Sequence, residues 1–151
     1  MGNRVGPKAI GDHADADALA VAFQRAYDQA GITNPREQVD VAEIYAPFSS
    51  VELHVIEAAG LADKGKSPIA LANGDFTLGG NGVTVNPSGG TQCTNPIAVT
   101  GLIRVGEAAN QVLGLAGAYQ VQDARVAIAS AIGGDHQFYS TMVICSDLEE
   151  I

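Results

Sequence analysis

The chain has 151 residues, of which 46% are hydrophobic and 17% are charged, and its net charge is -9. This length and hydrophobic content fit a single globular domain over residues 1–151. The negative charge argues against a nucleic-acid partner, whose phosphates need clustered Lys and Arg. No apolar run reaches the roughly 18–20 residues of a membrane helix, and the first residues lack the apolar run of a signal peptide. We therefore expect a cytoplasmic protein with no membrane span.

The first predicted element is a helix over residues 15–30, because its apolar residues recur at three- and four-residue steps. Asp12 or Asp15 suits its start, and Gly31 suits its end. Alternating apolar and polar residues over 39–45 then predict a strand.

A second helix is predicted to begin at Ser49, which forms a capping-box pattern with Glu52, and to end at Gly60. Residues 73–90 contain too many turn residues for regular structure. The helix that follows these two segments has a strong start signal.

A third helix is predicted to begin at Asn95 and Pro96, since Asn caps helices and Pro suits the first helical position. It continues toward Leu113 and contains Gly101 and Gly106, each of which costs up to about 1 kcal/mol relative to Ala. That cost suggests that another backbone packs very close to this helix.

The last predicted elements are strands over 125–131 and 138–145, joined by a loop that contains Gly133, Gly134 and His136. Strands and helices alternate along the chain, which is typical of the α/β class. No pair of cysteines has metal-ligand spacing, and we predict no metal site. Cys145 lies in an apolar strand, where we expect it in the core.

Four short segments together resemble the thiolase family. Residues 86–90 resemble its N-P-S-G-G loop, and residues 40–48 resemble the strand and loop that carry N-E-A-F or H-D-x-F. Residues 94–101 resemble the helix start G-H-P-x-G-A-S-G, and residues 131–134 resemble the C-x-G-G loop. The motifs occur in the family's order over roughly residues 15–144, nearest to sterol-carrier-type thiolases and their divergent bacterial and archaeal relatives.

The resemblance implies the C-terminal half of a thiolase fold, with a mixed five-stranded sheet and helices on both faces. It implies that a similar N-terminal half supplies the acylated cysteine, so this chain is either a fragment or a subunit completed by another polypeptide. The expected partners are a thiolase N-terminal half or a homologous subunit, within an oligomer. A coenzyme A thioester is the implied substrate, and no cofactor is implied.

Three positions depart from the family's pattern. Asn95 stands where the family has a histidine, and it can donate a hydrogen bond but cannot take a proton near neutral pH. Ala131 stands where the family has a proton-shuttling cysteine, and Tyr45 stands at the asparagine or histidine position. Some divergent thiolase-fold proteins are similar to this pattern: they use tyrosine, act as retro-aldolases on steroid side-chain CoA esters, and work with a small OB-fold partner.

We therefore predict Tyr45, Asn95 and His136 as catalytic residues. Tyr45 can act as a general acid or base, or it can simply pack at a strand end with a satisfied hydroxyl. Asn95 can have a role in the site beyond capping, or its role can be limited to capping the helix. His136 can replace the lost base from a loop near the pocket, or it can be a loop residue without a role.

We predict Ser88, Gly89, Gly90 and Cys93 as substrate-binding residues. The first three let the backbone approach a ligand or the opposing half. Cys93 precedes the predicted helix start, which can lower a thiol pKa, although a buried and inert thiol is the alternative.

Two functions follow from the resemblance. The first is half of an enzyme that makes or cleaves a carbon–carbon bond beside a CoA thioester, by acyl transfer or by tyrosine-dependent retro-aldol cleavage. The second is a non-catalytic thiolase-fold subunit that stabilises or regulates an active partner.

Overall fold

The computed structural model describes residues 2–3, 17–134 and 138–147. Within these residues the chain forms one mixed sheet of five strands in the order β1-β5-β4-β2-β3. β2 is parallel to β3 and β4, whereas β5 is antiparallel to both β4 and β1. The strands are β1 Gly2–Asn3, β2 Val41–Glu43, β3 Thr84–Val85, β4 Val126–Gly133 and β5 Phe138–Cys145. The predicted α/β class and mixed five-stranded sheet are confirmed.

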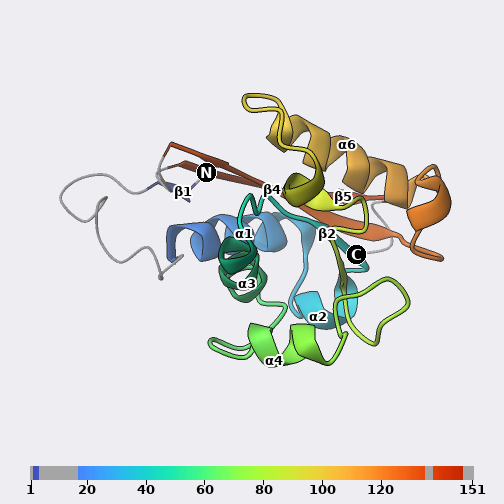
Figure 1. Cartoon of the computed structure of the whole chain (residues 1–151), viewed down its shortest axis with the longest axis horizontal. Helices are drawn as coiled ribbons and strands as arrows, with labels where there is room; N and C mark the ends of the chain where they lie inside the picture. The colour runs from blue at the N-terminus through green and yellow to red at the C-terminus, as the bar shows by residue number, and fades with distance from the viewer. Residues whose placement is uncertain (1, 4–16, 135–137, 148–151) are drawn as a thin grey trace.

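Helices cover both faces of this sheet, as the family resemblance implied (Figure 1). In the view of Figure 1, α6 (Thr100–Val112) lies above the sheet, and α1 (Asp17–Ala30) and α3 (Ser49–Ala58) lie below it. Shorter helical segments connect the larger elements: α2 Pro35–Gln38, α4 Ser67–Ala72, α5 Gly90–Cys93 and a 3-10 turn at Gly117–Tyr119. In the part of the chain that the structure describes, no helix is long and apolar enough to cross a membrane.

The larger core cluster lies between the sheet and α1. Leu19, Phe23 and Tyr27 recur at four-residue steps on α1 and are nearly fully buried, so they form the apolar face that the sequence predicted. The rings of Phe23 and Tyr27 stack with their centroids 5.9 Å apart. The Tyr27 hydroxyl donates to the carbonyl of Ala59 over 2.8 Å, and this bond ties α1 to the end of α3.

The smaller core cluster lies between the sheet and α6. β4 contributes Val126 and Ile128 to the larger cluster and Ala127 and Ala129 to this one. Successive side chains of a strand point to opposite faces, so β4 is buried on both sides. Small residues, including Ala108 of α6, allow the helix to lie close to the sheet.

The structure corrects the predicted secondary structure at β3 and at the start of α3. Residues Thr84 and Val85 form β3 inside the stretch predicted to be irregular, because the parallel pairing with β2 is a long-range contact. The residue that caps α3 is Phe48, without a side-chain hydrogen bond. Glu52 therefore forms no capping box with Ser49; its carboxylate instead accepts hydrogen bonds from Asn86 and from a glutamine of α5.

Candidate functional site

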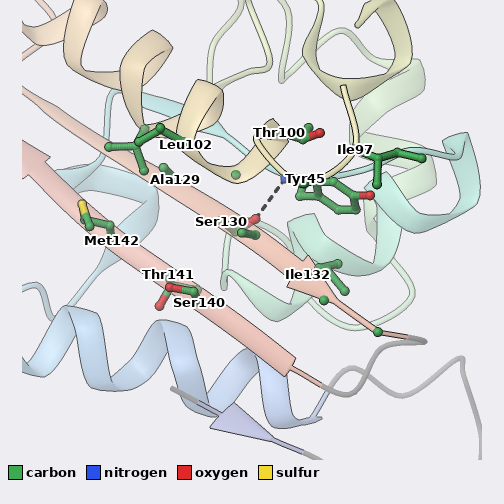
Figure 2. Close-up of a pocket in the computed structure, with 16 residues that line it drawn as sticks. Tyr45, Ile97, Thr100, Leu102, Ala129, Ser130, Ile132, Ser140, Thr141 and Met142 are labelled. Atoms are coloured by element: carbon green, nitrogen blue, oxygen red, sulfur yellow. Dashed lines mark hydrogen bonds between the residues drawn. The ribbon is translucent and has the colours of Figure 1, made fainter. Parts of the chain in front are cut away.

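An open pocket of about 650 Å³ lies between α6 and strands β4 and β5 (Figure 2). In Figure 2, Tyr45, Ile97 and Ile132 lie at one end of the pocket, and Leu102 and Met142 lie at the other. None of the described residues that line it is a Lys, Arg, His, Asp or Glu. The lining is Tyr45, Ile97, Ala98, Thr100, Gly101, Leu102, Val105, Ala129, Ser130, Ala131, Ile132, Gly133, Gly134, Ser140, Thr141 and Met142.

Tyr45 follows the end of β2 and is half-buried at the pocket. Its backbone amide donates to the hydroxyl of Ser130 in β4 over 3.0 Å, the bond drawn as a dashed line in Figure 2. Within the described residues its own hydroxyl makes no hydrogen bond, so the phenol is available to a ligand. Tyr45 thus lies at a pocket, and its catalytic role stays a prediction.

Ala131 lines the same pocket as Tyr45, so the structure brings together two of the positions that depart from the thiolase pattern. A Cβ added to Gly101 of α6 would lie 2.5 Å from the Cβ of Ala131. This distance is far shorter than an ordinary carbon–carbon contact of about 3.5–4.0 Å. The close approach predicted for Gly101 is confirmed. For Gly106 the same prediction was wrong, because nothing lies within 4 Å of an added Cβ.

Asn95 is exposed and does not line the pocket. Its side-chain oxygen accepts a hydrogen bond from the Thr100 hydroxyl over 2.8 Å. The prediction that Asn95 caps the helix was wrong: α6 begins at Thr100, with Val99 as the N-cap and no side-chain cap. The physical reason is Ala98, whose φ of 82° lies in the left-handed region and interrupts the helix before it starts.

The loop at residues 86–90 does not line the pocket either. Ser88 donates its hydroxyl hydrogen to Glu43 over 2.8 Å, and its oxygen accepts from Arg104 over 2.8 Å. Gly89 and Gly90 have φ values of 89° and 58°, which glycine adopts without strain. The backbone here is approached closely by the chain's own side chains, since a Cβ on Gly89 would lie 2.6 Å from the Cys93 sulfur.

Cys93 is exposed and forms the last residue of α5. Because α6 begins only at Thr100, Cys93 does not lie at the helix start that was expected to lower its pKa. Cys145 is half-buried and packs against the larger core cluster, as expected. His136 lies outside the described residues. The substrate-binding roles of Ser88, Gly89, Gly90 and Cys93 remain predictions.

A buried ion pair that was not predicted from the sequence lies beneath the loop at residues 86–90. Arg104 donates to a carboxylate oxygen of Glu43 over 2.5 Å, and both side chains are almost fully buried. Burial raises the pKa of Glu43, whereas hydrogen bonds from Ser88 and the charge of Arg104 oppose that shift. The Nε of Arg104 is buried without a hydrogen-bond partner among the described residues. Helical periodicity gave no signal for this pair, because the buried face of α6 is largely polar whereas its apolar residue Leu102 is exposed.

Comparison with protein families shows a match to the thiolase C-terminal domain-like family, whose model matches residues 8–146. Among curated proteins, the chain is 39% identical over 118 residues to sterol carrier protein 2 of Oryctolagus cuniculus, covering 78% of this chain and 21% of that protein. It is 32% identical over 119 residues to an acetyl-CoA acetyltransferase of Methanothermobacter thermautotrophicus, covering 78% of this chain and 30% of that protein.

A third relative is the benzoylsuccinyl-CoA thiolase subunit BbsB of Thauera aromatica, 34% identical over 110 residues that cover 72% of this chain and 28% of that protein. The chain thus spans between about a fifth and a third of the length of these relatives. Among solved structures, the Ltp2-ChsH2(DUF35) aldolase superposes with a TM-score of 0.72 at 23% identity, over 85% of this chain and 31% of that chain. This last likeness is one of fold.

Proposed function

The chain belongs to the thiolase C-terminal domain-like family, and we propose that it forms the C-terminal half of a thiolase-like unit that acts on coenzyme A thioesters. One observation carries the proposal: Tyr45 and Ala131, from two separate family motifs, line one open and uncharged pocket. Two curated relatives are named for CoA-thioester chemistry, an acetyl-CoA acetyltransferase and a benzoylsuccinyl-CoA thiolase subunit. Such a pocket suits the uncharged acyl part of a thioester.

Within this class we propose carbon–carbon cleavage of the retro-aldol kind. A base of the completed site removes the proton of a β-hydroxyl group on the acyl chain. The hydroxyl carbon becomes a carbonyl, the bond between the α and β carbons breaks, and its electron pair moves to the thioester enolate. The enolate carbon then takes up a proton. Negative charge develops on the thioester oxygen, where a hydrogen-bond donor is most effective, and the free Tyr45 hydroxyl is such a donor.

Ordinary thiolase chemistry receives less support from these residues. Asn95 and Ala131 stand at the positions where the family has its histidine and its second cysteine, and neither side chain exchanges protons near neutral pH. Acyl transfer by this chain would therefore need acid–base groups from another polypeptide. Tyr45 is the one titratable side chain among the described residues that line the pocket.

The pocket is incomplete in this chain alone. Ile97, Leu102 and Met142 line it and are 87%, 73% and 48% exposed, an unusual concentration of large apolar side chains on a surface. No described lining residue is cationic, so the phosphates of coenzyme A find no ion-pair partner among these residues. We propose that a thiolase N-terminal half or a homologous subunit supplies both the cover and the nucleophile, within an oligomer. A small OB-fold protein is a further proposed partner.

A non-catalytic subunit is the second candidate. The observation that favours it is the same scarcity of acid–base groups, since Tyr45 is alone among the described lining residues in having a titratable side chain. In this case the chain would stabilise an active partner or bind acyl-CoA without chemistry.

The test is to isolate the protein from its native source and to identify by mass spectrometry any longer polypeptide or stoichiometric partner. The isolated assembly is then assayed with acetyl-CoA and with 3-hydroxyacyl-CoA esters. Cleavage of the 3-hydroxyacyl esters supports the proposed activity. Binding of acyl-CoA with no turnover in the intact assembly supports the non-catalytic subunit instead.

A further inference from the structure

The short segment that carries Tyr45 is held by side chains rather than by a neighbouring strand. β2 ends at Glu43, which is the last residue paired with β4. From the next residue onward, three consecutive backbone amides donate to side-chain oxygens. We propose that Ser130 and Thr91, together with Asn86, are positioning residues that aim the Tyr45 phenol into the pocket. This inference rests on the proposed function and names residues that act on it through Tyr45.

The three hydrogen bonds come from three separate parts of the fold. The amide of Ile44 donates to Asn86 Oδ1 over 2.8 Å, that of Tyr45 donates to Ser130 Oγ over 3.0 Å, and that of Ala46 donates to Thr91 Oγ1 over 2.8 Å. Asn86 follows β3, Ser130 lies in β4, and Thr91 lies in α5. The backbone on either side of Tyr45 is therefore tied to three elements at once.

Burial makes these bonds necessary. Ile44 and Ala46 are 0% exposed, and Ser130 and Thr91 are 2% and 4% exposed. A buried amide that loses its acceptor without a replacement costs about 1–3 kcal/mol. The three side-chain acceptors thus stand in for the strand that would otherwise pair with this segment.

Asn86 and Ser130 are themselves held in place by their surroundings. Asn86 Nδ2 donates to the Glu52 carboxylate of α3 over 2.8 Å, so both ends of the Asn86 amide group are engaged. Ser130 follows a run of apolar residues in β4 and neighbours Ala131, which lines the pocket. A buried hydroxyl in such a strand is costly unless it is hydrogen-bonded, and the Ser130 oxygen accepts a hydrogen bond from the amide of Tyr45.

The phenol depends on this backbone for its direction. The Tyr45 side chain is half-buried, and its hydroxyl has no hydrogen-bond partner among the described residues. Nothing at the tip of the ring therefore fixes where it points. The direction of the ring is set by packing and by the backbone from which it leaves, and the three amide bonds hold that backbone.

The test compares Ser130→Ala and Thr91→Val with Thr91→Ser, which keeps the hydroxyl, and with Tyr27→Phe, which removes a buried hydrogen bond away from the pocket. The four tyrosines are labelled with ¹³C at the phenol carbon, in the protein with any partner that co-purifies. We expect amide exchange to speed up by at least about fivefold, at position 45 in Ser130→Ala and at position 46 in Thr91→Val. The Tyr45 ring resonance should shift or broaden in both variants, while Thr91→Ser and Tyr27→Phe leave it unchanged.

Activity gives a second readout in the intact assembly. If a 3-hydroxyacyl-CoA ester is cleaved, kcat should fall about tenfold or more in Ser130→Ala and Thr91→Val with KM altered less than about twofold, and Thr91→Ser should restore it. An unmoved Tyr45 resonance in both variants would overturn the positioning role, whatever the activity. A moved resonance in an assembly that never cleaves acyl-CoA would uphold the positioning and refute the proposed function instead.

Discussion

Replacing Gly101 with alanine tests the close contact that forms one wall of the pocket. The added Cβ would lie 2.5 Å from the Cβ of Ala131, so α6 and β4 would have to separate by about 1 Å or more to reach an ordinary contact. Overpacking of this kind costs about 1–3 kcal/mol. The gain in helix propensity, up to about 1 kcal/mol, is only partly realised because Gly101 is the second residue of the helix.

Gly106 provides a matched control in the same helix. It is exposed, and nothing lies within 4 Å of an added Cβ, so Gly106→Ala should raise the free energy of unfolding by up to about 1 kcal/mol. We expect Gly101→Ala to lower it by about 1–2 kcal/mol, as measured by urea denaturation of both variants. In an Ala131→Gly background, where the opposing Cβ is gone, Gly101→Ala should lose most of its cost.

Equal stability of Gly101→Ala and Gly106→Ala would refute the reasoning. It would mean that α6 does not pack against β4 at the distance described. The pocket that Tyr45 and Ala131 line would then have a different width.

Further predictions concern the buried pair, the strained turn and a surface pair. Arg104→Met should lower the free energy of unfolding by about 3–5 kcal/mol, because it leaves the buried Glu43 carboxylate without its ion-pair partner. In urea denaturation, adding Glu43→Leu should recover much of this loss. Ala98→Gly should raise the same free energy by about 0.5–1 kcal/mol by relieving a left-handed residue; an unchanged value would count against that conformation. The hydrogen bond and charge of Arg36 lower the pKa of Asp63, so Arg36→Gln should return that pKa toward its usual value in a carboxyl NMR titration. Since the folded-state pKa of Asp63 is depressed, the stability from this pair is present above the unfolded-state pKa, about 4, and is lost as the pH falls through the folded-state pKa.

Much of the fold was predictable because its signals are local. The four-residue steps of Leu19, Phe23 and Tyr27 define the buried face of α1, and that periodicity needs no knowledge of the partner surface. The strands β4 and β5 are 8 residues long each, and they lie where the sequence placed them to within two residues.

The start of α6 was predicted wrongly for a physical reason. Asn95 and Pro96 form a strong local start signal, but Ala98 has a left-handed φ and Thr100 binds the Asn95 side chain. The segment thus forms a separate turn before the helix. A local pattern cannot reveal a single residue that breaks the helical path.

The buried pair could not be predicted from spacing. Glu43 lies two residues after Val41 and so on the same face of β2, and it is 0% exposed because α6 covers that side of the sheet. Its partner Arg104 lies 61 residues further along the chain. Motif matching singled out Tyr45 and Ala131, which the structure places in one pocket. It could not show that the Ser88 hydroxyl is hydrogen-bonded to Glu43 and Arg104.

The most direct test of the central claim is turnover by Tyr45→Phe in the intact assembly, with Tyr119→Phe as the matched control. The control also loses a tyrosine hydroxyl, one that donates to Glu107 over 3.0 Å and does not line the pocket. If Tyr45 stabilises the developing enolate, cleavage of a 3-hydroxyacyl-CoA ester should fall by about 100-fold or more in Tyr45→Phe and stay near the unmodified rate in Tyr119→Phe, with both variants folded by circular dichroism. Full turnover by a folded Tyr45→Phe protein would remove this tyrosine from the chemistry.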